Sequence, residues 1–225
     1  LNLKFIKIPS GEINNVNLLR CIARMNKKII LSTGMASLKE VGFAIKVLKK
    51  NGLDRKKISI LQCTTDYPTQ LKDVNLKSMV TMKEKFKVDV GLSDHTIGNE
   101  ASMSAVSLGA KIIEKHITLD NNMRGPDHKA SLNPKKFKEL VAKIKNVEIL
   151  LGSYSKKPNK SELKNKKIVR KSIVAKSNIK KGEIFSNTNI ACKRPEGGIS
   201  PIYWDKIIGK KSKKNFKVDD FISLR

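Results

Sequence analysis

The stretch Val88–Ser131 reads VDVGLSDHTIGNEASMSAVSLGAKIIEKHITLDNNMRGPDHKAS and contains every histidine of the chain. Its first part, Val88–Leu92, is the apolar run of a buried strand, and Glu100–Leu108 has the small and apolar residues of a helix. Lys111–Ile117 predicts the next strand. A strand, a helix and a strand in succession favour parallel pairing, so the carboxyl ends of both strands are expected at one rim of the sheet.

Two histidines stand at these neighbouring strand ends. His95 follows the first strand, and His116 lies near the end of the second. Adjacent parallel strands are about 4.8 Å apart, so the two imidazoles are expected to converge. Their convergence predicts a metal site, which the nearby acidic residues and the third histidine support: Asp94, Glu114, Asp127 and His128. The alternative is a pair of satisfied polar residues that only cap the sheet.

The same alternation extends on both sides of this stretch. Earlier strands are predicted at Phe5–Ile8, Lys28–Leu31 and Lys57–Gln62, and helices at Asn15–Met25, Ser37–Lys50, Asn75–Phe86 and Pro134–Leu151. Ser37 and Glu40 have the spacing of a capping box, and Asn133 followed by Pro134 is a typical helix start. Five strand–helix units predict an α/β fold with a parallel sheet and helices outside it.

A closed barrel of eight such units takes about 200–250 residues. Only five units precede a change of composition, and the chain starts at Leu1 directly before a strand. We therefore expect an incomplete TIM-type (β/α) barrel over residues 1–152 that lacks its first three units. An open five-stranded doubly wound domain is the structural alternative.

The remaining residues have a different pattern. Residues 153–171 are rich in Lys, Asn and Ser and predict a linker. Residues 172–225 consist of short apolar pieces separated by turns, at Lys181-Gly182 and at Gly197-Gly198. They are numerous enough for a small domain with a limited core.

The composition argues against several classes of protein. The 225 residues carry a net charge of +27, mostly from lysine, whereas sequence-specific nucleic-acid readers favour arginine and stacking aromatic residues, which are scarce here. No apolar run approaches the roughly 20 residues that span a membrane, and the start has no signal-peptide pattern. The three cysteines have no CxxC spacing and are typical of reduced thiols in a cytoplasmic protein. We expect neither nucleic acid nor membrane as a partner.

Each predicted strand ends in a short polar motif: PSGE, STGM, CTTDYP, SDHT and EKHIT. Barrel enzymes build their sites from such ends because the fold brings them to one rim. The set suits an anionic substrate, with one cation, several hydroxyls, two glycines and three carboxylates: Lys7; Ser10, Ser32, Thr65 and Ser93; Gly11 and Gly34; Glu12, Glu114 and Asp127. Each motif alone is typical of any turn, but recurrence at five consecutive strand ends predicts a site.

These motifs carry a family resemblance. KIPSGE, ILSTGM, CTTDYP, GLSDHT, EKHITLD and GPDHKASL, in this order, resemble the sialic acid (nonulosonate) synthase family. The pieces KSIVAKSNIKKGEIF and KRPEGGISP resemble that family's C-terminal antifreeze-like SAF domain. The resemblance covers nearly the whole chain.

The resemblance implies a transferase that condenses phosphoenolpyruvate with N-acetylmannosamine, or with a related N-acylated amino-sugar. The products would be N-acetylneuraminate, or a related nonulosonate, and phosphate. The GPDHKASL motif is also compatible with a synthase of diacetyllegionaminate. The resemblance further implies a divalent cation, Mn²⁺ or Mg²⁺, and a domain-swapped homodimer.

It also implies a role for each site residue. His95 and His116 would hold the metal and act with Glu12 and Glu114 as the catalytic residues. Substrate contacts would come from Lys7 to the phosphoenolpyruvate carboxylate, from Ser10, Ser32 and Ser93 to its phosphate, from Glu12, Tyr67 and Asp127 to the sugar, and from Arg194 of a neighbouring subunit to the N-acyl group. Thr65 stands where some members have Asn, which weakens a phosphate role for that side chain.

Part of the family's machinery lies on the first barrel strands, which this chain is expected to lack. The chain by itself is therefore predicted to be inactive. A hypothesis of another class is a non-catalytic carbohydrate- or partner-binding module. Metal-dependent turnover distinguishes the two.

Overall fold

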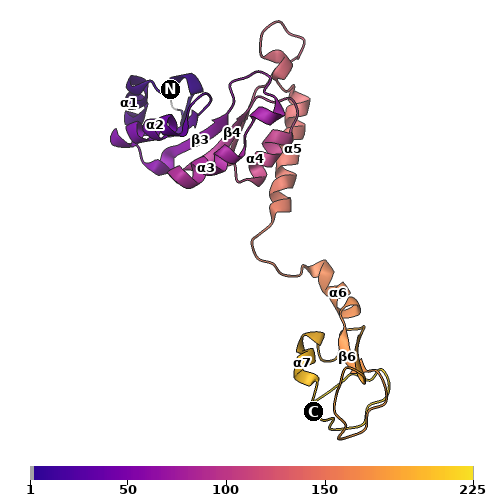
Figure 1. Ribbon diagram of the computed structural model, residues 1–225. Helices are drawn as coiled ribbons and strands as arrows, with labels where there is room; N and C mark the ends of the chain where they lie inside the picture. The colour runs from indigo at the N-terminus through magenta and orange to yellow at the C-terminus, as the bar shows by residue number, and fades with distance from the viewer. Residues whose placement is uncertain (1–2, 225) are drawn as a thin grey trace. The chain divides into compact units, whose positions relative to one another are not determined.

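The structure is a computed structural model that describes residues 3–224. The chain divides into two compact units, Leu1–Gly152 and Ser153–Arg225 (Figure 1). Each unit has its own cluster of buried apolar side chains. In the described part of the chain, no helix has the length and apolar character that crossing a membrane requires.

The first unit is built from alternating strands and helices. Its elements are β1 (Phe5–Ile8), α1 (Val16–Arg24), β2 (Lys28–Ser32), α2 (Leu38–Lys50), β3 (Ile58–Cys63), α3 (Lys77–Phe86), β4 (Asp89–Asp94), α4 (Glu100–Ser107), β5 (Ile112–Lys115) and α5 (Pro134–Leu151). Short 3₁₀ turns are η1 (Ser10–Glu12), η2 (Arg55–Lys57), η3 (Leu71–Asp73) and η4 (His128–Ala130). All neighbouring strands pair in parallel, in the order β1-β2-β3-β4-β5. The prediction of five strand–helix units is confirmed.

The predicted helix starts are also found. The Ser37 hydroxyl accepts a hydrogen bond from the Glu40 amide at 3.4 Å, and the Glu40 carboxylate accepts one from the Ser37 amide at 2.7 Å. Asn133 caps α5 by accepting from the Lys136 amide at 2.9 Å, with Pro134 in the first turn. These caps satisfy amide groups that have no partner inside the helix.

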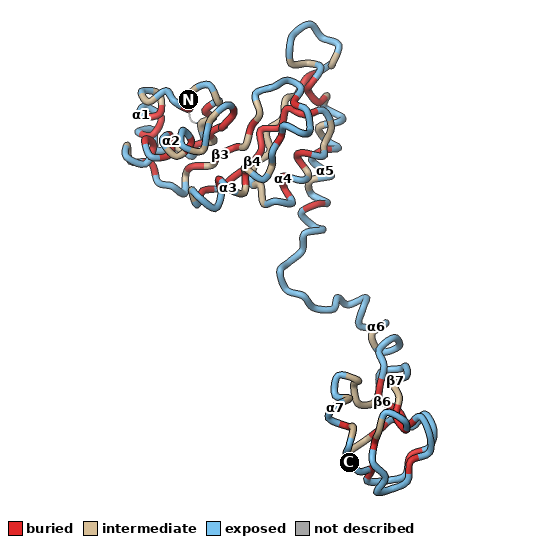
Figure 2. Tube along the Cα trace, in the orientation of Figure 1, coloured by how far each residue is buried: buried red, intermediate tan, exposed pale blue. Residues whose placement is uncertain are grey.

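Alternation along the strands separates two faces of the sheet. On the face toward the helices, strand residues two positions apart are buried with helical residues: Ile29 and Leu31, Ile58 and Ile60, Val90 and Leu92 with Leu19, Val41, Leu48, Met79 and Ala105. Figure 2 shows buried residues along the strands, and buried residues interspersed with exposed ones along the helices. Because side chains alternate along a strand, the residues between these positions point to the opposite face.

A close approach of two strands occurs at Gly91. It pairs with Ile112 of β5, and a Cβ added to Gly91 would collide with the Ile112 carbonyl oxygen. Replacing Gly91 by alanine is expected to lower the free energy of unfolding by about 1–3 kcal/mol, since overpacking of a filled interior costs that much.

Urea unfolding of the Gly91→Ala variant measures this cost. Gly11→Ala is the control, because no atom lies within 4 Å of a Cβ built there. Equal stabilities of the two variants would contradict the expected collision.

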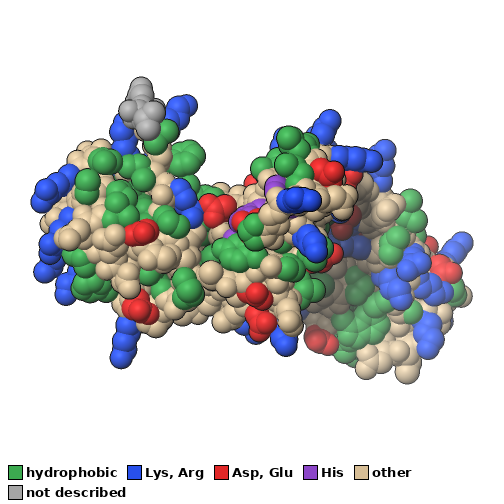
Figure 3. Space-filling view, turned by 90° about the horizontal axis from the view of Figure 1, so that it is seen from above, with side chains coloured by type: hydrophobic (Ala, Val, Ile, Leu, Met, Phe, Trp, Pro, Cys, Tyr) green, Lys and Arg blue, Asp and Glu red, His purple; other side chains and the backbone are tan. Residues whose placement is uncertain are grey.

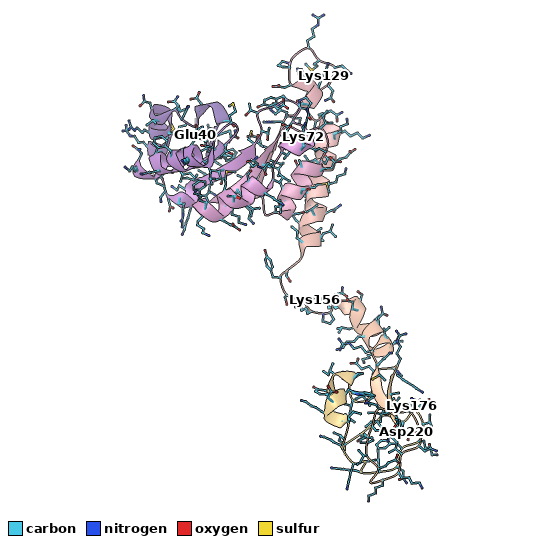
Figure 4. The ribbon with its side chains drawn as sticks, viewed as in Figure 1. Glu40, Lys72, Lys129, Lys156, Lys176 and Asp220 are labelled. Carbon is cyan, nitrogen blue, oxygen red and sulfur yellow. The ribbon has the colours of Figure 1, made fainter. Side chains whose placement is uncertain are left out.

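The second unit begins with a segment of exposed residues. Residues 153–171 were expected to form a linker, and most of this segment is helix α6 (Lys160–Val169), which has no buried residue (Figure 2). Its capping box at Asn159 and Glu162 explains why a polar segment becomes helical. Lys156 lies before this helix (Figure 4).

The rest of the second unit is a small domain around an antiparallel pair, β6 (Ser172–Ala175) and β7 (Ile190–Lys193). Its remaining elements are η5 (Pro201–Tyr203) and α7 (Trp204–Ile207). Its core consists of Ile173, Ala175, Ile179, Phe185, Ile190, Ile207, Phe216 and Ile222. The buried Ser172 hydroxyl donates to the Pro195 carbonyl at 2.9 Å and accepts from the Gly197 and Gly198 amides. It thus fixes the loop that follows Arg194.

Candidate functional site

The register of the sheet brings polar side chains together on the face away from the helices. Cys63 of β3 pairs with Ser93 of β4, and Ser93 pairs with Glu114 of β5. The Ser93 hydroxyl donates to the Glu114 carboxylate at 2.7 Å, and the Lys7 ammonium lies 3.4 Å from the same oxygen. Residues from β1, β4 and β5 therefore meet at one point.

This meeting requires a strongly curved sheet. Lys7 and Glu114 lie on the two edge strands, which in a flat sheet would be about 19 Å apart at about 4.8 Å per strand spacing. A lysine and a glutamate side chain cannot bridge that distance. The five strands therefore form an arc, as expected for part of a barrel, and their polar face is concave.

The two imidazoles at the strand ends lie beside each other. The ring centres of His95 and His116 are 5.2 Å apart, with the rings nearly perpendicular. His95 is buried, and its Nδ1 lies 2.8 Å from the Thr64 carbonyl oxygen. A carbonyl can only accept, so Nδ1 carries the proton, while Nε2 lies 3.3 Å from the Ser93 hydroxyl oxygen. His116 Nδ1 lies 3.7 Å from a carboxylate oxygen of Asp127.

The separation of these two rings is compatible with a shared divalent cation. Imidazoles that bind one ion at roughly 2.1 Å have ring centres on the order of 5 Å apart. A carbonyl or carboxylate on the other ring nitrogen is the usual outer partner of a histidine ligand. Among residues 3–224, no group of three or more His, Cys, Asp and Glu side chains is placed to hold an ion. Oxygen ligands from water or substrate would therefore complete the shell, which suits Mn²⁺ or Mg²⁺.

Tyr67 covers both rings. Its ring centre is 4.2 Å from that of His95 and 5.5 Å from that of His116. Partial burial, followed by the charges of Cys63, Asp127 and Glu114, raises the pKa of Tyr67. The phenol thus stays protonated near neutral pH and can donate a hydrogen bond.

Cys63 belongs to the site, although the sequence pointed only to a reduced thiol. Burial raises the pKa of this thiol, but hydrogen bonds with His95, Ser10 and Ser93 and the charge of His95 together lower it below its ordinary value. Burial lowers the pKa of His95, while Cys63, the Thr64 carbonyl and the charge of Asp94 raise it overall. The position of Cys63 opposite Ser93 in the register is the signal that identifies it.

The hydroxyls expected to hold an anion lie at the ends of β1 and β2. The Gly34 amide donates to the Ser10 hydroxyl at 2.9 Å, and a Cβ on Gly34 would collide with the Ser10 and Thr65 hydroxyls. The Ser32 hydroxyl is buried without a hydrogen-bond partner. Such an orphaned donor favours a site for a bound acceptor group.

Three further residues have other surroundings. The Glu12 carboxylate accepts from the Asn15 side chain at 2.7 Å. His128 bonds through Nδ1 to the Thr118 hydroxyl at 2.7 Å, so it fixes the loop before α5 that presents Asp127 and Lys129 (Figure 4). Arg194 lies in the second unit, where its Nε donates to the Val169 carbonyl at 3.0 Å.

The site is open to solvent on one side. Figure 3 shows histidine side chains on one face of the molecule, with acidic and basic side chains beside them. Lys7 and Glu114 have side chains that are 30% and 38% exposed. A small anionic molecule can therefore reach the ammonium group and the rings.

Residues 1–156 match the NeuB family, and residues 170–224 match the SAF domain. The chain belongs to the NeuB family. This confirms the family that the motifs predicted, together with its C-terminal SAF domain.

Individual relatives agree with this assignment. The NeuB-family chain is 55% identical over 222 residues to N,N'-diacetyllegionaminic acid synthase of Campylobacter jejuni, covering 99% of this chain and 66% of that protein. It is 37% identical to N-acetylneuraminate-9-phosphate synthase of Homo sapiens over 99% of this chain and 62% of that protein. A solved structure of N-acetylneuraminic acid synthetase from Leptospira borgpetersenii has 35% identity and a TM-score of 0.67, over 73% of this chain and 56% of that one.

The chain spans 61–66% of the length of the first curated relatives that it matches. The contacts described above therefore do not include any that the remaining part of those relatives makes in its own functional site.

Proposed function

We propose that this chain carries the metal and sugar side of a nonulosonate synthase, which condenses phosphoenolpyruvate with an N-acylated amino-sugar. One observation carries the proposal. The rings of His95 and His116 lie with centres 5.2 Å apart, beside the cluster of Lys7, Ser93 and Glu114. The lysine and the hydroxyl groups would bind an anion, and a metal held by the histidine pair would act on a carbonyl compound that reacts with this anion.

The proposed substrate is an amino-sugar with two N-acetyl groups, and the product is then diacetyllegionaminate. The chain is 55% identical to a diacetyllegionaminic acid synthase and 37% identical to the human N-acetylneuraminate-9-phosphate synthase. The higher identity supports diacetyllegionaminate as the product over N-acetylneuraminate. N-Acetylmannosamine, which the motifs suggested first, becomes the second candidate.

The side chains of the chain divide the work of holding the reactants. Lys7 would bind the carboxylate of phosphoenolpyruvate, while Ser10, Ser32 and Ser93 would donate to its phosphate. Tyr67, Asp127 and Glu12 would contact the sugar. Holding two reactants in attack geometry supplies a large part of the rate acceleration in such condensations.

The bond changes follow from the reactants. Carbon 3 of phosphoenolpyruvate attacks the aldehyde carbon of the sugar, and a carbon–carbon bond forms. Water adds to carbon 2, and the bond between carbon 2 and the phosphate oxygen breaks to release inorganic phosphate. The two protons of this water end on the former aldehyde oxygen and on the phosphate, and carbon 2 becomes a ketone. Held by His95 and His116, a divalent cation would supply Lewis-acid polarisation of the aldehyde oxygen. Glu114, which accepts a hydrogen bond from Ser93 and lies beside Lys7, would accept a proton from the attacking water.

Two further parts of the proposal rest on the family. Arg194 would reach the N-acyl group in the site of a neighbouring subunit of a domain-swapped homodimer. The cation would be Mn²⁺ or Mg²⁺, because water and substrate oxygens complete the shell.

Phosphate release and product mass test the proposal. The chain, and a version extended at its N-terminus to the length of its relatives, are each incubated with phosphoenolpyruvate, Mn²⁺ and one amino-sugar. We expect phosphate release only from the extended version, and a product whose mass corresponds to the diacetylated sugar plus the three-carbon unit.

Three results would change the proposal. A product formed only from N-acetylmannosamine would make N-acetylneuraminate the correct product. No release from either version would favour the non-catalytic binding module. Equal rates from both versions would contradict the expectation that the 225 residues alone are inactive.

A further inference from the structure

A buried ion pair is formed by the residues that immediately precede the two histidines in the chain. The Lys115 ammonium is 2.9 Å from the Asp94 carboxylate, and their side chains are 1% and 0% exposed. Asp94 and Lys115 are also partners in the register of β4 and β5. The pair therefore joins the last residues of these two strands.

Every polar atom of this pair has a partner. One Asp94 oxygen accepts from the Thr96 amide at 2.9 Å and from the Thr96 hydroxyl at 2.8 Å, and the other accepts from Ser102 of α4 at 2.6 Å. Lys115 also donates to the Thr96 carbonyl at 2.6 Å. The strand end, the following turn and helix α4 are thus connected through two side chains.

The next residue of each strand is a histidine. His95 follows Asp94, and His116 follows Lys115. Since neighbouring side chains point to opposite faces, the ion pair lies on the helix side and the rings lie on the concave side. The backbone pairing of β4 and β5 sets the distance between these strands, and the ion pair adds a side-chain link directly before the backbones of His95 and His116.

We propose that the Asp94–Lys115 pair is a positioning device that holds His95 and His116 at the separation a shared divalent cation requires. The inference rests on the proposed function for the cation, but its geometric part concerns only this chain. Neither Asp94 nor Lys115 contacts the concave face, so both act through the histidines rather than on substrate.

A buried pair is weak evidence for stability, because neutral groups of similar shape often replace it without loss. The variant Asp94→Asn/Lys115→Met uses this property. The asparagine Oδ1 can accept from Thr96, and its Nδ2 can donate to the Ser102 hydroxyl, which then accepts. Methionine fills the lysine space without the bonds that cross from β5 to β4. The variant is expected to fold and to lose only the tie. Lys111→Met is the matched control, because Lys111 is an exposed residue that precedes β5.

Two measurements on the 225-residue chain test the inference. The first is the nuclear Overhauser effect between the ring protons of His95 and those of His116, measured without metal. The signal of the His128 ring protons is the internal reference for its intensity. The second is Mn²⁺ affinity by titration calorimetry. In the double variant we expect the ring-to-ring effect to fall by at least half and the Mn²⁺ affinity to fall by roughly 10–100-fold, the usual cost of losing support for metal ligands. Lys111→Met should leave both unchanged.

The outcomes separate the inference from the proposed function. An unchanged ring-to-ring effect in the folded double variant overturns the inference, whatever the affinity. A reduced effect, in a protein whose unmodified form binds no Mn²⁺, supports the positioning role and contradicts the metal part of the proposed function. Asp94→Asn alone keeps the Lys115 bond to Thr96 and should give a smaller change in the same direction, which tests the inference if the double variant does not fold.

Discussion

Replacing Lys115 by methionine is expected to lower the free energy of unfolding of the first unit by about 3–5 kcal/mol. The single substitution leaves the Asp94 carboxylate buried, with its partners reduced to Thr96 and Ser102. An uncompensated charge away from water is among the most costly defects in a folded protein. Urea unfolding followed by circular dichroism gives the change.

The double variant makes this prediction sharper. Asp94→Asn/Lys115→Met should recover most of the lost stability, because the remaining buried group is then neutral. The two effects are therefore strongly non-additive, as expected for side chains in direct contact. Lys111→Met, an exposed change of the same chemistry, should stay within about 0.5 kcal/mol. If Lys115→Met lowered the free energy of unfolding by no more than this, methionine would replace every stabilising contribution of the ion pair.

Replacing His116 by alanine is expected to weaken Mn²⁺ binding by more than about 100-fold. The reason is that loss of an outer partner alone costs roughly 10–100-fold, and His116 is one of the two proposed protein ligands. Its side chain is 32% exposed, so the substitution should not disturb the core. Calorimetric titration of Mn²⁺ measures the affinity, and circular dichroism checks the fold.

Lys129→Ala is the matched control for this experiment. It shortens an exposed side chain in the loop that also carries Asp127, and it should change Mn²⁺ affinity by less than roughly threefold, because exposed substitutions usually have small effects. If both alanine variants lose affinity equally, the cation does not lie between His95 and His116.

Local patterns in the sequence were sufficient for the architecture of the first unit. The apolar runs that end at His95 and near His116 predicted two parallel strands, and β4 and β5 end at Asp94 and Lys115. Caps at Ser37 and Asn133 were equally visible, because capping depends on residues three positions apart. The side-by-side placement of the two rings follows from parallel neighbours, while their role as metal ligands remains a prediction.

Contacts that depend on register or on the curvature of the sheet were not visible in the sequence. Asp94 was read as support for a metal site, whereas its carboxylate faces Lys115 on the helix side. Cys63 was read only as a thiol, and it lies in the site because β3 and β4 pair with Cys63 opposite Ser93.

By itself, the sequence determined the order of strands and helices, the family, and the rim at which the polar motifs gather, because periodicity and caps are properties of neighbouring residues. Only the tertiary structure decided which of those polar residues touch. Lys7 meets Glu114 because the sheet is curved enough for side chains of its two edge strands to touch, and Asp94 meets Lys115 because the register aligns them. Both depend on interactions between segments far apart in the chain, which local patterns do not encode.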